Sequence, residues 1–267
     1  MSVRRLAVLG YPVAHSRSPA MQTAALAALG LADEWEYGAI EVAPEEFAAR
    51  VRALSGEGFA GANVTVPHKQ AALALADAPS EVAREIGAAN TLVFNGEAIG
   101  AHNTDADGFL RSLPESPGGK RTLVLGAGGA ARAIVWALGR ERATVEVWNR
   151  TPERAERLCG GLGGTAVSDP DQAAYDLIVN TTAVGLTGEN PFAVLPLTSE
   201  GFTVEQTVVD MVYAEGGTAL LRAAEGAGAT VVDGIEVLVQ QGALSLKIWT
   251  EQDPPLEAMR AAARGRS

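Results

Sequence analysis

Short apolar segments alternate with alanine-rich stretches along nearly the whole chain, and this alternation restricts the fold more than any other feature. Each apolar segment has the length of one strand, and the stretches between them have an amphipathic, helix-like pattern. Strands that alternate with helices form mostly parallel sheets covered by helices. The sequence therefore predicts an α/β protein. The apolar segments are 6–9, 37–42, 61–66, 123–125, 145–148, 177–179, 208–210 and 230–232.

Two places in the sequence divide this pattern into domains. Prolines and glycines crowd into residues 113–120, just before a strong strand–turn–helix signal, which is typical of a linker. Residues 235–250 carry apolar side chains at helical spacing and predict a helix that returns to the first domain. We therefore predict one domain from residues 1–104 with 235–267, and a second, Rossmann-like domain from residues 105–234.

Composition excludes several classes of protein. Of the 267 residues 47% are hydrophobic and 20% are charged, as in packed globular proteins. The formal net charge of -11 opposes binding to nucleic acid or to anionic membrane surfaces. No segment reaches the roughly 18 apolar residues of a membrane helix, and the start does not have a signal-peptide pattern. The single cysteine, Cys159, cannot form an internal disulfide and is interpreted as an apolar filler. We expect a cytoplasmic protein without metal, nucleic-acid or membrane partners. The sequence leaves the oligomeric state open, and a homodimer is one alternative.

The clearest motif lies in the second domain. The apolar strand 121–125 leads directly into Gly126, Gly128 and Ala131 and then into an alanine-rich helix, which is the G-x-G-x-x-A pattern of a dinucleotide-binding turn. A tight turn that binds nothing could carry the same glycines, but the strand and helix around them favour a diphosphate at the helix N-terminus. The residues expected at this turn are Gly126, Ala127, Gly128, Gly129 and Ala130.

The end of the next strand indicates which dinucleotide binds. An NAD-binding protein usually has an acidic residue about twenty positions after the glycines, where it bonds the ribose 2'-hydroxyl. Here the chain reads Asn149-Arg150-Thr151, with Arg154 one turn later. Arginines in place of a carboxylate favour a 2'-phosphate, so we predict NADP as the cofactor. The alternative is that both arginines merely belong to the exposed face of a helix.

Polar residues gather at four places in the first domain. Ser16 and Ser18 precede Pro19 and could cap a helix or hold a carboxylate. Because side chains alternate along a strand, Asn63 and Thr65 point to the same face of it. Pro67 is predicted to open the next helix, which carries Lys69. Asp105 could be a helix cap or the partner of that lysine. The four segments are 11–19, 61–69, 89–91 and 100–108.

In their order and spacing these segments resemble the shikimate dehydrogenase family, whose members carry S-x-S-P, N-V-T-x-P-x-K, A-x-N-T and N-T-D-x-x-G. The resemblance continues through the glycine turn to Gln241. It implies that Lys69 and Asp105 are the catalytic pair and that NADP is bound by Asn149, Arg150, Thr151, Arg154, Met211 and Gly234 in addition to the glycine turn. It implies that the substrate is bound by Ser16, Ser18, Asn63, Thr65, Asn90, Tyr213 and Gln241.

The resemblance also implies a reaction. NADPH would reduce the C3 carbonyl of 3-dehydroshikimate to the alcohol of shikimate, with Lys69 as the proton donor held by Asp105. A quinate/shikimate dehydrogenase that uses NAD would share the substrate residues, but Arg150 and Arg154 argue against it. A methylene-tetrahydrofolate dehydrogenase would leave the S-x-S-P and N-T-D segments unexplained. A non-catalytic NADP-binding sensor would have no need of the lysine–aspartate pair.

Overall fold

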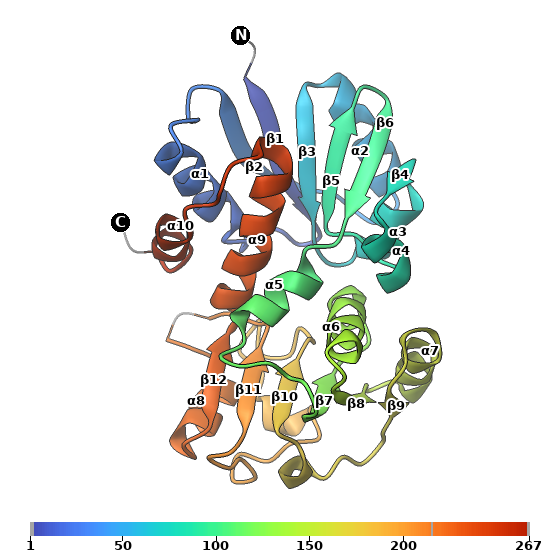
Figure 1. Ribbon diagram of the computed structural model, residues 1–267, viewed down its shortest axis with the longest axis vertical. Helices are drawn as coiled ribbons and strands as arrows, with labels where there is room; N and C mark the ends of the chain where they lie inside the picture. Colours follow the sequence, from blue (N-terminus) through green and yellow to red (C-terminus); the bar gives the residue numbers. More distant parts are fainter. Residues whose placement is uncertain (1–2, 215, 266–267) are drawn as a thin grey trace. The chain divides into compact units, whose positions relative to one another are not determined.

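The computed structural model describes residues 3–214 and 216–265, and the chain in it divides into two compact units (Figure 1). Unit 2 is Phe109–Val237, and unit 1 comprises the chain before and after it. Both crossings between the units lie inside helices, α5 (Asp105–Ser112) and α9 (Gly234–Thr250). The proline- and glycine-rich segment 113–120 follows the first crossing and lies within unit 2, because Phe109 already belongs to the core of that unit.

Unit 1 is built on a six-stranded sheet with the order β2-β1-β3-β5-β6-β4. β1 is parallel to β2 and β3, and β4 is parallel to β6, whereas β5 runs antiparallel to both of its neighbours. The sheet is therefore mostly parallel, as predicted. Its strands are β1 (Arg4–Gly10), β2 (Trp35–Glu41), β3 (Phe59–Val64), β4 (Ala78–Pro79), β5 (Thr91–Asn95) and β6 (Ala98–His102).

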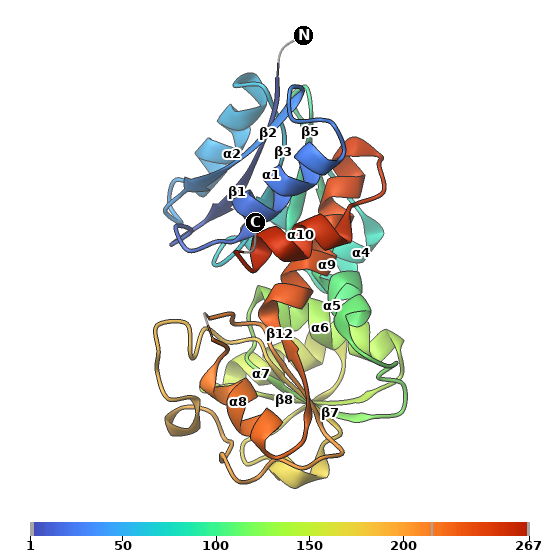
Figure 2. The same ribbon diagram turned by 90° about the vertical axis from the view of Figure 1, so that its left-hand side faces the viewer.

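Helices cover both faces of this sheet. Phe47, Val51 and Leu54 of α2 (Phe47–Gly56) enter one core with α3 (Lys69–Ala74), α4 (Glu81–Ile86) and alternate strand residues. α9 packs elsewhere on the sheet: Trp249 donates its indole N–H to the carbonyl of Leu92 at 2.9 Å. α1 (Ser18–Ala28) lies beside α10 (Leu256–Ala263), as Figure 2 shows.

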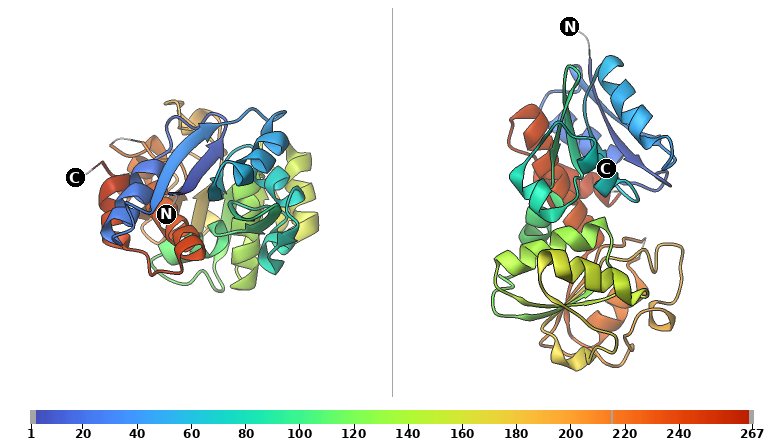
Figure 3. Two further views of the ribbon diagram at one scale, coloured as in Figure 1. Left: turned by 90° about the horizontal axis from the view of Figure 1, so that it is seen from above. Right: turned by 90° about the vertical axis from the view of Figure 1, so that its right-hand side faces the viewer.

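Unit 2 is built on a second six-stranded sheet, which is parallel throughout and has the order β12-β11-β10-β7-β8-β9. α6 and α7 share one core with the sheet, and α8 shares another core that contains the alternate strand residues (Figure 3). This is the predicted Rossmann-like layout. The elements are β7 (Arg121–Leu125), α6 (Gly129–Arg140), β8 (Thr144–Trp148), α7 (Pro152–Leu162), β9 (Thr165–Ala166), η1 (Gln172–Ala174), β10 (Leu177–Asn180), η2 (Pro191–Ala193), β11 (Thr207–Asp210), α8 (Ala219–Gly226) and β12 (Thr230–Asp233).

Within residues 3–214 and 216–265, no helix has the length and apolar character needed to cross a membrane.

Candidate active site

The direction of β5 gathers the polar segments of unit 1 at one edge of the sheet. Because β5 is antiparallel to β3 and β6, its first residue, Thr91, pairs with Asn63 near the end of β3 and with His102 at the end of β6. β3 is parallel to β1, so the chain after β1 leaves the sheet at the same edge. Three of the four predicted segments thereby converge in the contacts described below, and the serine segment joins them through Tyr37.

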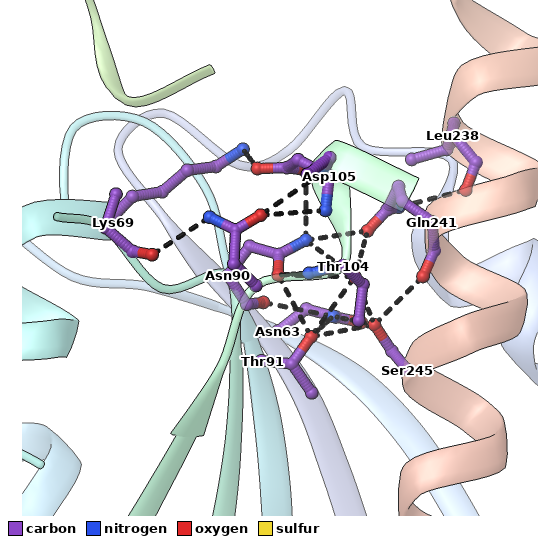
Figure 4. Close-up of polar contacts among 12 residues, drawn as sticks. Asn63, Lys69, Asn90, Thr91, Thr104, Asp105, Leu238, Gln241 and Ser245 are labelled. Carbon is purple, nitrogen blue, oxygen red and sulfur yellow. Dashed lines mark hydrogen bonds and ion pairs between the residues drawn. The ribbon is translucent and has the colours of Figure 1, made fainter. Parts of the chain in front are cut away.

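Lys69 and Asp105 form a buried ion pair at this edge. Nζ of Lys69 lies 2.6 Å from Oδ2 of Asp105, and the two side chains are only 12% and 5% exposed (Figure 4). Each residue is the first of a helix, α3 and α5 respectively. An ammonium has three N–H donors, so two remain for a ligand after this bond.

Asn90 holds the other oxygen of Asp105. Its Nδ2 donates to Oδ1 of Asp105 at 2.9 Å and to Oε1 of Gln241 at 3.1 Å. Its Oδ1 accepts the backbone N–H of Thr104 at 2.7 Å. A backbone amide can only donate, so the carboxamide of Asn90 has one possible orientation, with its nitrogen toward the carboxylate. The two oxygens of Asp105 are thus held separately, one by the first residue of α3 and the other by the residue before β5.

The cap of α5 is Asn103 and not Asp105. Oδ1 of Asn103 accepts the backbone N–H of Asp105 at 3.1 Å and that of Ala106 at 3.4 Å. The alternative reading of Asp105 as a simple helix cap is therefore wrong. Because Asn103 satisfies the first amides of the helix, the carboxylate of Asp105 is left for Lys69 and Asn90.

Gln241 reaches the pair because α5 and α9 pack closely. A Cβ atom added to Gly108 would lie 2.6 Å from the backbone of Gln241, so only glycine allows this approach. Nε2 of Gln241 donates to the carbonyl of Leu238 at 2.9 Å, which turns Oε1 toward Asn90. The predicted return of the C-terminal helix to unit 1 thus carries a predicted site residue into contact with Asn90.

Asn63 lies in a buried group of hydroxyls that we call the hydroxyl cluster, formed by Thr91, Thr104 and Ser245. Oγ of Ser245 lies 2.8 Å from Oγ1 of Thr91 and 3.1 Å from Oγ1 of Thr104. Nδ2 of Asn63 donates to Oγ of Ser245 at 3.0 Å, and its Oδ1 accepts the phenol of Tyr37 at 2.7 Å. Sequence reasoning did not assign a role to Thr91, Thr104, Ser245 or Tyr37.

Thr65 and Lys69 follow Asn63 along the chain. Thr65 is half-buried just after β3, and its N–H bonds the carbonyl of Leu9 at 2.8 Å. The prediction that Pro67 opens the next helix is wrong, because Pro67 lies in a turn and α3 begins at Lys69. The turn is held by buried His68, whose Nε2 bonds the carbonyl of Val42 at 2.8 Å.

Ser18 is the first residue of α1 and therefore not its cap. Arg17 occupies the cap position without a side-chain capping bond. Oγ of Ser16 accepts the N–H of Ser18 at 3.2 Å, as Asn103 does for the first residue of α5. Ser18 is buried and its side chain hydrogen-bonds Tyr37, a phenol whose pKa is raised, chiefly by burial, and is lowered to a lesser degree by this bond. Tyr37 therefore connects Ser18 with Asn63. Tyr213, predicted with this group, belongs to unit 2, in the segment between β11 and α8.

In unit 2 the glycine turn has the expected backbone. Gly126 adopts a φ of +111°, and a Cβ atom there would lie 2.5 Å from Oγ1 of Thr181. Gly128 has open space around it, and as the cap of α6 it provides no side chain to its first turn. Gly126, Ala127 and Gly128 thus lead from β7 directly to the uncapped helix start at Gly129 and Ala130.

Residues 149–154, which follow β8 and include the start of α7, carry two exposed arginines. Nδ2 of Asn149 donates to the carbonyl of Thr151 at 2.8 Å, and the N–H of Arg154 bonds the same carbonyl at 3.0 Å. Arg150 and Arg154 are exposed, and neither guanidinium has a hydrogen-bond or ion-pair partner among the described residues. Two positive charges are therefore available at this strand end.

Met211 and Gly234 lie together at the ends of β11 and β12. A Cβ atom on Gly234 would lie 2.5 Å from the carbonyl oxygen of Met211. Next to them, buried Asp210 accepts from Nδ2 of Asn180 at 2.9 Å and from Oγ1 of Thr218 at 2.7 Å. Burial raises the pKa of Asp210, and these bonds oppose that shift. The network ties β10, β11 and the start of α8 together.

Comparisons with known proteins assign the chain to a family. The profile of the shikimate dehydrogenase substrate binding domain matches residues 8–92. Those of shikimate / quinate 5-dehydrogenase and of the shikimate 5'-dehydrogenase C-terminal domain match residues 111–184 and 234–264. A curated relative from Geobacter metallireducens, named shikimate dehydrogenase (NADP(+)), is 43% identical over 275 residues, covering 96% of this chain and 94% of the relative.

Solved structures agree. A shikimate 5-dehydrogenase from Thermus thermophilus, in complex with NADP(H) and shikimate, is 42% identical with a TM-score of 0.89, covering 98% of this chain and 99% of that one. A quinate dehydrogenase from Corynebacterium glutamicum, in complex with NAD, is 28% identical with a TM-score of 0.86, covering 97% and 98%. The resemblance read from the sequence motifs is confirmed: the chain belongs to the shikimate dehydrogenase family.

Proposed function

We propose that this chain catalyses the reversible, NADPH-dependent reduction of 3-dehydroshikimate to shikimate. The observation that carries the proposal is the buried pair of Lys69 and Asp105, 2.6 Å apart and joined to the carboxamide of Asn90. A ketone that becomes an alcohol needs a proton donor beside its oxygen, and a lysine held in one position meets that need.

Lys69 acts as the acid in reduction. When bound, NADPH supplies the hydride that reduces the carbonyl carbon. One of the two remaining N–H groups of Lys69 binds the carbonyl oxygen, stabilises the negative charge that develops there and then transfers its proton. The neutral amine regains a proton from water, and in oxidation the same amine removes the proton of the hydroxyl. Asp105 holds Lys69 in position throughout the reaction.

The substrate is held by polar groups from several segments. Ser16 and Ser18 bind the carboxylate, since two hydroxyls close together can both donate hydrogen bonds to its oxygens. The groups that bind the ring hydroxyls are Asn63, Thr65, Asn90 and Gln241, with Tyr213 of unit 2 also facing the substrate. Because Asn90 presents its nitrogen and Asn63 already accepts the Tyr37 phenol at Oδ1, these two amides constrain which ring hydroxyl donates and which accepts.

The residues at the strand ends of unit 2 fit NADP. The uncapped first turn of α6 after Gly128 offers backbone N–H groups to a diphosphate. Arg150 and Arg154, with Thr151 and Asn149 beside them, offer charge and hydrogen bonds to a 2'-phosphate. Met211 and Gly234 line the nicotinamide, at the other end of the cofactor from the 2'-phosphate. The turn residues are Gly126, Ala127, Gly128, Gly129 and Ala130.

Quinate oxidation with NAD is the nearest alternative function, and Arg150 and Arg154 argue against it because no carboxylate replaces them at the strand end. A non-catalytic NADP-binding sensor would not need a buried lysine–aspartate pair, which costs desolvation energy. We further place the enzyme in the cytoplasm, in the route to chorismate and the aromatic amino acids. A homodimer remains a prediction, which light scattering of the purified chain tests.

The test measures the absorbance of the reduced cofactor, NADPH or NADH, with purified protein in four arms that combine shikimate or quinate with NADP or NAD. We expect turnover to be fastest with shikimate and NADP. Faster turnover of quinate with NAD would establish the alternative function, and binding of NADP without turnover in any arm would establish a sensor.

A further inference from the structure

Ser245 is a fully buried serine on α9, one turn after Gln241, and polar groups from three segments of unit 1 surround its side-chain oxygen. Its oxygen lies near Asn63 of β3, Thr91 of β5 and Thr104 of the segment before α5 (Figure 4). Figure 4 shows its side chain directed from the helix toward these three groups. A serine buried only to satisfy its own hydroxyl would need one such partner.

The hydrogen atoms in this group can be counted. The hydroxyl of Ser245 donates to the carbonyl of Gln241 at 3.1 Å, since a carbonyl has no hydrogen of its own. The oxygen of Ser245 is then left to accept, and Nδ2 of Asn63 donates to it at 3.0 Å. The phenol of Tyr37 holds the other end of the same carboxamide. The carbonyl of Asn90 accepts from the same nitrogen at 3.1 Å and so fixes which end of Asn63 is nitrogen, whereas Ser245 and Tyr37 hold the two ends of the carboxamide in position.

The same oxygen acts on Asn90 through the hydroxyl cluster. Oγ1 of Thr91 and Oγ1 of Thr104 each lie within 3.2 Å of Oδ1 of Asn90 as well as near Ser245. The backbone N–H of Thr104 sets the orientation of this carboxamide, with Nδ2 toward Asp105. Ser245 acts on its position, because it bonds both hydroxyls that contact Oδ1 of Asn90.

We propose that Ser245 is a positioning residue for the substrate: it holds the carboxamide of Asn63 in place and, through Thr91 and Thr104, that of Asn90. The proposal rests on the proposed function, in which both amides bind ring hydroxyls. Ser245 itself does not touch the reacting atoms. Its loss therefore weakens the binding of shikimate and leaves the binding of NADP unchanged.

The experiment compares Ser245→Ala and Ser245→Cys with Thr250→Ala. The cysteine nearly preserves volume but is a poor hydrogen-bond acceptor, so it separates the lost bond from a cavity. Thr250 makes the same kind of bond on the same helix, to the carbonyl of Leu246 at 2.9 Å, and contacts none of the assigned substrate residues. KM for shikimate and for NADP, kcat and the melting temperature are measured for each.

We expect KM for shikimate to rise about tenfold in both Ser245 variants, equivalent to about 1.4 kcal/mol, with KM for NADP unchanged. Thr250→Ala should lower the melting temperature without changing either KM. The proposal is overturned if both Ser245 variants keep the wild-type KM for shikimate, or if Thr250→Ala raises it equally. If Ser245→Ala does not fold, Ser245→Cys decides alone. An inactive wild-type protein would instead refute the proposed function.

Discussion

The strand edges of the two units hold their polar groups in different ways. In unit 1 the side chains bond one another: Asp105 is bound by Lys69 and Asn90, and Asn63 by Ser245 and Tyr37. In unit 2 the corresponding positions carry an uncapped helix start and two exposed arginines without partners among residues 3–214 and 216–265. The side chains at the edge in unit 1 are already joined by hydrogen bonds without a ligand, whereas the donors named in unit 2 remain available to one.

The difference matches the chemistry proposed for each edge. A small polyol can be oriented only by groups that already point in fixed directions, because flexible amides would lose much of the binding energy in becoming ordered. A dinucleotide phosphate is attracted by charge and by backbone N–H groups, which need less prior order. Substitutions in unit 1 should therefore act on the substrate and the rate, and substitutions in unit 2 on the cofactor.

The largest expected effect is that of Lys69→Ala. We expect kcat to fall about a thousandfold, within the usual range for a general acid, while NADP binding is retained. The comparison variant Lys247→Ala removes an exposed lysine paired with Asp253 at 2.7 Å and should change turnover very little. NADPH absorbance gives kcat, and protein fluorescence gives cofactor binding. Near-normal turnover of Lys69→Ala would show that the proton comes from another group.

Replacing both Arg150 and Arg154 by alanine should act on the cofactor alone. Each arginine is expected to add about tenfold to NADP affinity through charge-assisted bonds, so KM for NADP should rise about a hundredfold. KM for NAD, which has no 2'-phosphate, should stay the same. Arg157→Ala, an exposed position on the same helix, is the matched control. An equal loss for NAD and NADP would mean that the arginines do not read the 2'-phosphate.

Two glycines offer a smaller test of the same comparison. In Gly108→Ala the new methyl group would meet the backbone of Gln241 at 2.6 Å, so the free energy of unfolding should fall by about 1–3 kcal/mol and KM for shikimate should rise. Gly128→Ala meets nothing within 4 Å and should leave stability unchanged while raising KM for NADP. Urea unfolding and steady-state kinetics measure both. Equal destabilisation by the two variants would contradict this distinction.

The sequence was sufficient wherever a function depends on local order. The glycine turn at 126–128 needs only a strand, a backbone turn and a helix in succession, and the helical character of α9 follows from its apolar spacing. The pairing of Lys69 with Asp105 was obtained from motif resemblance and is seen in the structure at 2.6 Å. The roles of the assigned site residues remain predictions.

Sequence reasoning missed one residue that depends on contacts between distant segments, and it also missed two local features. Ser245 gains its partners only because α9 packs against β3 and β5, and nothing in its neighbours along the chain marks it. The β5–β6 hairpin was overlooked, although Asn95-Gly96 between two strands is a turn signal and Gly96 has a φ of +62°. Asn103 lies in the predicted segment 100–108, but its residue type does not mark it as the cap of α5, because Asp105 is an equally good capping residue by type.

The smallest expected effect concerns His102, at the end of β6 in unit 1. Burial lowers the pKa of its imidazole below the ordinary 6.5, so the folded chain binds a proton less readily than the unfolded chain. As the pH falls through 6.5, the unfolded state gains a proton first, and the free energy of unfolding decreases until the folded pKa is passed. His102→Gln, which has no proton to gain, should lose this part of the pH dependence. Urea unfolding of both proteins at about pH 8 and about pH 5.5 measures the difference, because all other titrating groups are shared. If the two proteins lose equal stability between these pH values, the imidazole is not held in its neutral form by burial.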